Sequence, residues 1–88
     1  MDVVEDRQFR KGKKRSIKRH QDQTKLEDVI IKLLNGEKLP EKYHDHKLQG
    51  SYDDCRECHI EPDWLLIYRI EGDTLHLIRT GSHADLFG

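Results

Sequence analysis

The sequence predicts an α+β domain in which two N-terminal helices pack against one face of an antiparallel β-sheet. Apolar residues recur at helical spacing before residue 36, whereas β-rich runs separated by turn residues follow after residue 55. Eighty-eight residues suffice for one small domain, so we expect a single domain over residues 1–88. Charged residues make up 38% of the chain and hydrophobic residues 34%, which predicts a lean core beneath a highly charged surface.

The N-terminal part is predicted to contain a short strand and then a helix. Val3 and Val4 are β-branched and favour the start of an edge strand. The helix is expected over about residues 6–21, where Phe9 and Ile17 are the main apolar anchors of a weakly amphipathic pattern.

The second helix has clearer boundary signals. Thr24 and Glu27 have the spacing of a capping box, in which each side chain satisfies a backbone N–H of the first turn. Asn35-Gly36 suits the left-handed cap that commonly ends a helix. Between these signals an apolar stripe follows the helical period through Leu26, Val29, Ile30, Leu33 and Leu34.

Three strands are predicted in the C-terminal part, at residues 56–61, 64–71 and 74–83. Pro62-Asp63 and Gly72-Asp73 separate them and provide the residue types that two-residue turns require. Loops this short fix the pairing, because each residue then faces the one at an equal distance beyond the turn.

The resulting register brings several titratable residues to one end of the sheet. His59 is expected opposite Leu66, and Leu66 opposite Arg79. Residues in one cross-strand row share a face, so the backbones of His59 and Arg79 should lie roughly 10 Å apart on the same face. Beyond that row, at the same end of the sheet, we expect Asp63, Trp64 and His83.

The same register sorts the apolar strand residues onto two faces. One face would carry Cys58, Ile60, Leu65, Ile67 and Ile78. The other would carry Leu66, Tyr68, Ile70, Leu75 and Leu77. Both faces are partly apolar, so the pattern alone does not decide which face the helices cover.

Charge is distributed unevenly along the chain. Residues 1–20 contain eight basic and three acidic residues, whereas the whole chain has a formal net charge of −1. A dense basic helix is typical of contact with a phosphate backbone, and a solvated helix face is the equally weighted alternative. The candidate contacts with an RNA backbone are Lys11, Lys14, Arg15 and Lys18.

Cysteine usage and hydropathy bound the compartment and the cofactors. No apolar run reaches the ~20 residues of a membrane span, and no signal-peptide pattern is present, so we expect a cytoplasmic protein with reduced cysteines. Cys55-Arg56-Glu57-Cys58-His59 matches the pattern of covalent haem attachment, but it lies in a predicted strand. Cys55 and Cys58 would point to opposite strand faces, which disfavours a zinc site. We therefore expect no metal, no small-molecule cofactor and two free thiols, one buried and one peripheral.

The side chains expected at the end of the sheet suit chemistry on a phosphodiester. Histidine titrates near neutral pH, so a pair of imidazoles can act as general base and general acid. Arg79 can hold a phosphate through two hydrogen bonds, and Asp63 can orient an imidazole or accept a proton. Trp64 and Phe87 offer rings on which bases can stack. These residues favour metal-independent RNA cleavage in which the ribose 2′-hydroxyl attacks the adjacent phosphorus.

Four motifs occur in an order that resembles one toxin family. They are His46-Lys47-Leu48 with Gly50, RECHI at 56–60, DWLLIY at 63–68 and LIRTGSHADLF at 77–87. Together they closely resemble the YafQ branch of the RelE superfamily, which are toxins of bacterial type II toxin–antitoxin modules. Residues 1–45 agree only through the helix–helix pattern and Phe9.

This resemblance implies a twisted antiparallel sheet whose first strand comes from the N-terminus, and a ribosome-dependent endonuclease that cuts mRNA codons in the ribosomal A site. The implied acid/base set consists of His46, His59, Asp63 and His83. The transition-state phosphate would be bound by Arg79. The mRNA bases would be held by Trp64 and Phe87. Within the set, we expect His83 to protonate the leaving group, with His46 or Asp63 as the base.

The resemblance also implies a set of partners. A cognate antitoxin would fold its C-terminal segment over the site, and the joint complex would repress its own promoter, so that DNA is contacted only through that complex. The alternative function is a non-catalytic module on the same fold, which binds RNA or the antitoxin without cleaving.

Overall fold

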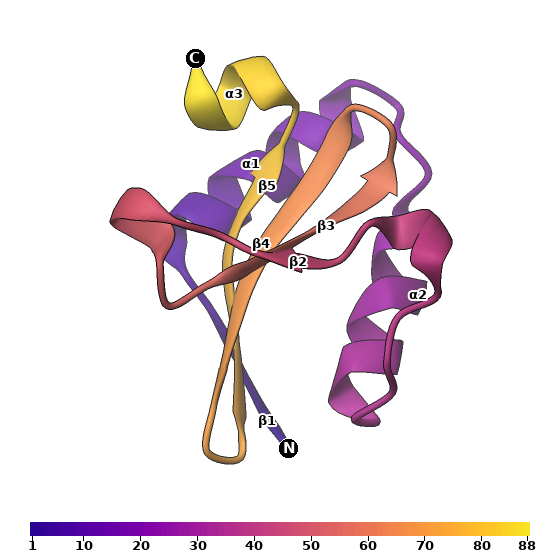
Figure 1. The fold of residues 1–88 in the computed structure, drawn as a ribbon. Helices are drawn as coiled ribbons and strands as arrows, with labels where there is room; N and C mark the ends of the chain where they lie inside the picture. Colours follow the sequence, from indigo (N-terminus) through magenta and orange to yellow (C-terminus); the bar gives the residue numbers. More distant parts are fainter.

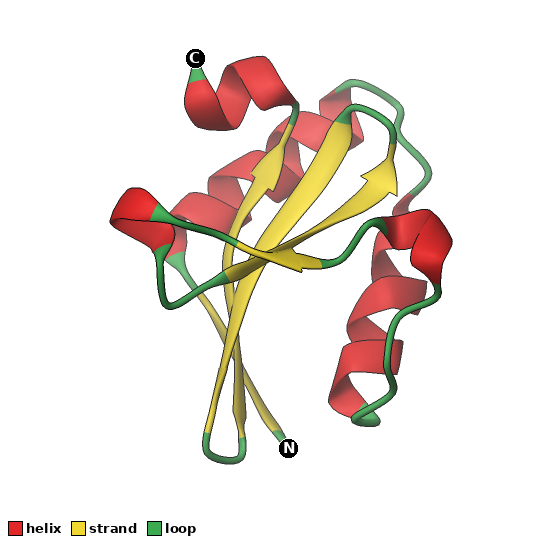
Figure 2. Cartoon of the chain, in the orientation of Figure 1, coloured by secondary structure: helices red, strands yellow, loops and turns green.

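The computed structural model describes residues 1–88 as three helices on a five-stranded mixed sheet (Figure 1), with the elements coloured by type in Figure 2. The strands are β1 (Asp2–Glu5), β2 (His46–Lys47), β3 (Arg56–Glu61), β4 (Trp64–Glu71) and β5 (Thr74–Gly81). The helices are α1 (Arg7–Lys18), α2 (Gln23–Leu34) and α3 (His83–Phe87), and two 3-10 turns are η1 (Glu41–Tyr43) and η2 (Gly50–Tyr52). The predicted α+β class is confirmed.

The strand order is β1-β5-β4-β3-β2, and the three longest strands form the antiparallel centre. The expected N-terminal strand exists, but β1 runs parallel to β5, with Val3 opposite Leu75. A wholly antiparallel sheet was therefore the wrong expectation at this edge. Parallel neighbours need a long crossover connection, and the chain between β1 and β5 supplies it.

Helix α1 lies directly against the backbone of β5. Asp6 caps its first turn by accepting a hydrogen bond from the backbone N–H of Gln8. Gly12 is buried on the side that faces β5, and a Cβ there would overlap the carbonyl oxygen of Thr80. Only glycine therefore allows the helix to approach this closely, which explains a residue that otherwise weakens a helix interior.

Helix α2 begins one residue before the predicted capping box. Asp22 is the cap, and its carboxylate accepts hydrogen bonds from both the backbone N–H and the hydroxyl of Thr24. The proposed box of Thr24 and Glu27 is wrong, because Asp also caps helices well and occupies the position two residues earlier. The predicted apolar stripe is confirmed, since Leu26, Val29 and Leu33 are buried.

Two irregularities in strand pairing change which residues share a face. Between His59 and Glu61 the register of β3 against β4 shifts, so His59 faces Leu65 instead of Leu66. A second shift between β4 and β5 places Arg79 opposite Ile67. A bulge turns every later side chain to the other face, but two bulges compensate. His59 and Arg79 therefore share a face, as predicted, although they lie in adjacent rows instead of one.

The bulges also correct the predicted division of apolar residues. Cys58 and Ile60 belong to the main core with Leu66, Tyr68 and the helices, not with Leu65 and Ile67. A smaller core on the opposite face contains Cys55, Leu65, Ile67 and Leu86. The first core answers the question that the pattern left open: α1 and α2 cover the face that carries Leu66, Tyr68, Leu75 and Leu77.

The short helix α3 was not predicted, because the last strand was extended to residue 83 and no element was assigned after it. Ser82 and Asp85 form a capping box, in which each side chain accepts a hydrogen bond from the backbone N–H of the other residue. Leu86 anchors the helix to the smaller core. Helix α3 therefore fixes His83 at its first position, above the end of the sheet.

Candidate active site

Four imidazoles lie together at one end of the sheet, although they come from separate parts of the chain. His59 of β3 is central: its ring centroid lies 5.4 Å from that of His44, 6.4 Å from that of His46 and 5.7 Å from that of His83. The predicted grouping of residues 46, 59 and 83 is thus present in the structure. His44 joins them because it has a left-handed backbone (φ 48°) that turns the chain after η1.

Asp63 fixes the ring of His83. Its Oδ1 accepts one hydrogen bond from the backbone N–H of His83 at 2.9 Å and another from ring Nδ1 at 2.6 Å. The backbone bond and then the ring bond hold the pKa of Asp63 below its usual value. Because a carboxylate accepts hydrogen bonds, Nδ1 carries the ring proton, and Nε2 remains to exchange a proton with a ligand.

His46 has its tautomer fixed in a similar way. Its Nδ1 lies 2.7 Å from the carbonyl oxygen of His44. A carbonyl can only accept, so Nδ1 is the donor and neutral Nε2 keeps a lone pair. That nitrogen can take a proton, which is what a general base requires.

Glu57 is a site residue that the sequence reasoning missed. Its carboxylate is only 6% exposed, and Oε1 lies 3.5 Å from Nε2 of His46 and 3.7 Å from Nε2 of His59. Its other oxygen, Oε2, is buried without a hydrogen-bond partner. A signal was available, because a Glu two residues before His59 on one strand must share its face. Buried charge without full pairing is costly, which favours a functional role for this carboxylate.

Arg79 lies on the same face but is largely engaged with α3. Its Nη1 donates to the hydroxyl of Tyr52 at 3.4 Å and to the carbonyl of Leu86 at 3.3 Å, while Nη2 donates to the carbonyl of Asp85 at 3.2 Å. These contacts satisfy backbone groups at the end of the helix. The Nε–H and one Nη2–H remain, so Arg79 retains donors for an anion after it has positioned α3.

The two aromatic residues expected to hold bases have different positions. Phe87 is 53% exposed on α3, and its ring meets that of Tyr52 edge-on at 6.5 Å. Trp64 is completely buried in the main core, where its indole N–H donates to Thr80 Oγ1 at 3.0 Å. Trp64 therefore offers no face to a base, and its predicted role is wrong. Trp64 shares the helix-covered face with Leu66 and Tyr68, because alternate residues of β4 point to the same side.

A second carboxylate ties α3 to α1. Asp85 binds the guanidinium of Arg19 through both oxygens, at 2.6 and 3.2 Å, and Nη1 of Arg15 lies 3.6 Å from it. The hydrogen bond from Arg19 holds the pKa of Asp85 well below its usual value. A Cβ at Gly81 would collide with the Asp85 side chain, so the glycine makes room for this contact.

The other predicted surface residues are exposed as expected, with one difference. Lys11, Lys14 and Lys18 project from α1 into solvent. Arg15 is partly buried and close to Asp85, so it is shared between the basic face of α1 and the contact with α3.

Both cysteines are buried and free, so the expectation of one peripheral thiol was wrong. Burial raises the pKa of Cys55 to about 11 and raises that of Cys58 further. No group of three or more His, Cys, Asp or Glu side chains is arranged to hold a metal ion. No helix of the chain is long and apolar enough to cross a membrane.

Residues 1–88 match a family model described as the bacterial toxin of type II toxin–antitoxin systems, YafQ. The chain belongs to the YafQ family. It is 44% identical over 88 residues to the mRNA interferase toxin YafQ of Escherichia coli strain K12, covering 99% of this chain and 96% of that protein. The family resemblance predicted from the four motifs is confirmed.

Solved structures of YafQ proteins have the same fold. The crystal structure of YafQ from E. coli strain BL21(DE3) superposes with a TM-score of 0.95 at 43% identity, covering 99% of this chain and 98% of that one. The E. coli DinJ–YafQ complex matches with a TM-score of 0.92 at 44% identity, covering 99% of this chain and 98% of the matched one. The fold described above is therefore shared with these YafQ proteins over nearly the whole length of the chain.

Proposed function

We propose that this chain is the toxin of a type II toxin–antitoxin module and an endoribonuclease that cuts mRNA on the ribosome without a metal ion. Membership of the YafQ family and the mRNA interferase named among its relatives support the class of activity. The observation that carries the chemistry is the imidazole cluster, in which His46 and His83 each have Nδ1 committed, so that proton exchange falls to Nε2. In His46 this Nε2 lies 3.5 Å from Oε1 of Glu57, which can compensate the charge of the protonated ring.

The geometry favours one division of roles between the base and the acid. His46 Nε2 takes the proton from a ribose 2′-hydroxyl, whose oxygen then bonds to the adjacent phosphorus. The bond from phosphorus to the 5′-oxygen breaks, and protonated His83 gives the Nε2 proton to that leaving oxygen. The products are a 2′,3′-cyclic phosphate and a 5′-hydroxyl, and no water molecule is consumed.

Asp63 is better suited to a supporting role than to that of the base. Its lowered pKa makes the carboxylate a weak proton acceptor near neutral pH, and both of its hydrogen bonds go to His83. It orients the ring and compensates the positive charge of the protonated form, as a carboxylate does beside a catalytic histidine. Of the two bases that the sequence left open, we therefore propose His46.

The remaining site residues bind the reacting phosphate and its neighbours. His59 lies between the base and the acid, where it can donate a hydrogen bond to a nonbridging phosphate oxygen, and Glu57 holds it there. The free N–H groups of Arg79 reach the same anion from β5, stabilising charge that develops in the transition state. The exposed ring of Phe87 stacks on an mRNA base.

The partners follow from the same proposal. A cognate antitoxin binds the chain, as DinJ is bound to YafQ in the E. coli complex. Lys11, Lys14 and Lys18 contact ribosomal RNA phosphates near the A site. Promoter DNA is contacted only by the complex with the antitoxin, and the site of action is the cytoplasm.

The decisive experiment separates an enzyme from a binding module. Purified protein is incubated with ribosomes carrying a defined mRNA, and the ends of the message are mapped. We expect cuts at one codon position with a 2′,3′-cyclic phosphate end, and no cuts with His83→Gln, which keeps the Asp63 contact but cannot act as the acid. A message that stays intact while the protein remains bound would support the non-catalytic alternative.

Growth arrest gives the matching test in cells. The double substitution of Arg79 and His83 by Ala should abolish arrest, and His83→Gln alone should do so with α3 left in place. Antitoxin binding serves as the control for folding. Arrest by a correctly folded double variant would show that the site lies elsewhere.

A further inference from the structure

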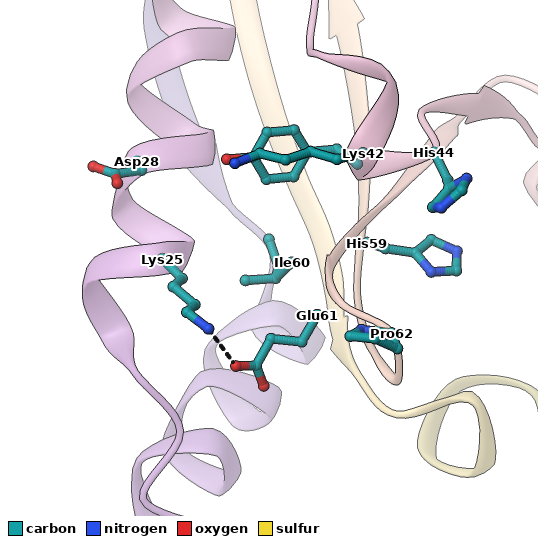
Figure 3. Close-up of a pocket in the computed structure, with 9 residues that line it drawn as sticks. Lys25, Asp28, Lys42, His44, His59, Ile60, Glu61 and Pro62 are labelled. Atoms are coloured by element: carbon teal, nitrogen blue, oxygen red, sulfur yellow. Dashed lines mark hydrogen bonds and ion pairs between the residues drawn. The ribbon is translucent and has the colours of Figure 1, made fainter.

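A groove of about 630 Å³ opens directly beside the imidazole cluster. Helix α2 forms one wall through Lys25, and η1 with His44 forms the other through Lys42 and Tyr43 (Figure 3). The second half of β3, including His59, forms its floor. None of the roles assigned above uses this space beyond His59.

The groove exists because β2 is very short. It pairs only with Arg56 and Glu57, so the rest of β3 has no neighbouring strand on that side. The turn η1, which precedes β2 in the chain, packs against β3 through Tyr43 and leaves the groove between itself and α2. A ligand in the groove would lie against the uncovered edge of β3.

The lining contains an aromatic ring and a cation that has no carboxylate partner. The Nζ of Lys42 lies over the ring of Tyr43, 5.1 Å from its centroid. Lys25 differs, because its Nζ is paired with Glu61 at 2.9 Å. A long, exposed lysine is easily displaced, so a base can take its place on Tyr43 while the ammonium binds the adjoining phosphate.

The groove is also continuous with the proposed active site. The ring of His44 lines it and meets the ring of His59, which in turn meets the ring of His83. A nucleic acid whose scissile phosphate lies over His59 therefore has its next nucleotide at the mouth of the groove. The volume lies within the range of small-ligand pockets, and so accommodates one nucleotide.

We propose that this groove is a nucleotide-binding subsite of the toxin, which holds the nucleotide next to the scissile phosphate with its base on Tyr43 and its phosphate on Lys42. The proposal rests on the proposed function and extends it to a determinant of substrate selection. An antitoxin strand added to the open edge of β3 is the competing occupant. The unpartnered cation and the continuity with the imidazoles favour the RNA.

The test couples changes in the protein to changes in the message. Ribosomes are programmed with two mRNAs, each of which carries one abasic nucleotide, on one or the other side of the cleaved bond. The rate of single-turnover cleavage is measured at toxin concentrations below saturation and at saturation. The variants are Lys42→Ala and Tyr43→Leu, which keeps an apolar side chain against the core. Lys38→Ala is the matched control, because it removes the same charge from the neighbouring loop outside the groove.

With the unmodified protein, one abasic position should slow subsaturating cleavage by at least about fivefold, the lower range for loss of a base stack. Tyr43→Leu should cause a similar loss on the intact message and no further loss on the abasic one. Lys42→Ala should also weaken subsaturating cleavage, while Lys38→Ala and all rates at saturation stay near the unmodified values.

The subsite would be overturned if the abasic nucleotide slowed cleavage by the same factor in the unmodified protein and in Tyr43→Leu. Removal of the base and removal of the Tyr43 ring would then act independently. The subsite would also be overturned if Tyr43→Leu cleaved mRNA at an unchanged rate but bound the antitoxin tenfold more weakly. That result would assign the groove to the antitoxin. If the unmodified protein does not cut any message, the proposed function fails first, and the subsite fails with it.

Discussion

At the scale of single residues, the site depends on hydrogen bonds that decide which ring nitrogen is free. Asp63 accepts a hydrogen bond from Nδ1 of His83, and the carbonyl of His44 accepts one from Nδ1 of His46. In the proposed mechanism, Nε2 of each ring exchanges the proton, and that of His46 does so beside Oε1 of Glu57. Without these acceptors, a neutral imidazole in water would populate both tautomers. The two hydrogen bonds therefore fix the tautomer of each ring before RNA binds.

Asp63→Asn tests this preparation. The amide keeps the size of the side chain but loses the charge that compensates protonated His83, and its N–H₂ can present a donor to a nitrogen that must itself donate. We expect kcat in the ribosome assay to fall by about 10²- to 10⁴-fold, the usual contribution of a positioned general acid.

The control for Asp63→Asn is thermal unfolding. Asp63 is exposed, so Tm should change little while cleavage falls. A variant that kept full cleavage activity would show that His83 is oriented by something other than this carboxylate.

At the scale of secondary-structure elements, α3 is held in position by two contacts with arginines of other elements. Arg79 of β5 binds its last carbonyls, and Arg19 just beyond α1 binds Asp85 in its first turn. A five-residue helix has little stability of its own, so these arginines and Leu86 hold it in place. The position of the His83 imidazole therefore depends on the position of α1 against the sheet.

Gly12→Ala tests the contact of α1 with β5. Alanine is the better helix former by up to about 1 kcal/mol, but its Cβ would overlap the Thr80 carbonyl and push the helix away. We expect a net loss of about 1–3 kcal/mol, the usual cost of overpacking, measured by urea unfolding.

Lys14→Ala on the exposed face of the same helix is the matched control, and its stability should be unchanged or slightly higher. Equal or greater stability of Gly12→Ala would mean that α1 can move away from β5 at no cost.

The pH dependence of stability tests the contact of α1 with α3. Folding lowers the pKa of Asp85. The contribution of Asp85 to the free energy of unfolding is therefore fully present above the ordinary carboxyl pKa of about 4. It is lost as the pH falls through the lowered pKa of the folded state. Asp85→Asn should lower Tm at pH 7 by about 5 °C, and the difference from the unmodified protein should shrink steadily in strong acid.

Arg19→Ala should reproduce the loss at pH 7, since it removes the other half of the pair. A Tm difference for Asp85→Asn that stays constant at every pH would contradict the role of the ionised carboxylate.

At the scale of the whole molecule, charge is separated between α1 and the rest of the chain, although the net charge is only −1. The exposed lysines of α1 lie on an element that covers one face of the sheet, whereas the imidazoles gather at one end. A negatively charged surface can therefore be bound by the helix while the end of the sheet remains open to a single strand of RNA.

The salt dependence of ribosome binding tests this arrangement. Each phosphate contact that is removed should reduce the slope of log association constant against log salt concentration by about 0.7–0.9. Lys11→Ala combined with Lys14→Ala should thus reduce the slope by between about 1 and 2. The pair Lys32→Ala and Lys38→Ala is the control, and an equal effect of both pairs would show that only total charge matters.

Much of this architecture was predictable, and the exceptions have physical causes. Turn residues and apolar periodicity located α2 and the three central strands, because these signals are local. The faces of β3 were predicted wrongly, since a bulge adds one residue without a clear local signal. The burial of Trp64 was missed because the pattern did not decide that the helices cover the β4 face of Trp64, Leu66 and Tyr68. Glu57 was overlooked because its importance depends on two imidazoles that arrive from elsewhere in the chain. Helix α3 was overlooked because tertiary contacts, rather than its own length, stabilise it.

The position of α3 after the last strand has a consequence for synthesis of the protein. His83 reaches His59 only when β5 has paired with β4, so every earlier stage of translation yields a chain whose proposed acid, His83, is not in place. In the proposed mechanism, the chain therefore cannot cleave mRNA on the ribosome that makes it before residues 83–87 dock. From that moment on, the proposed activity requires an antitoxin to restrain it.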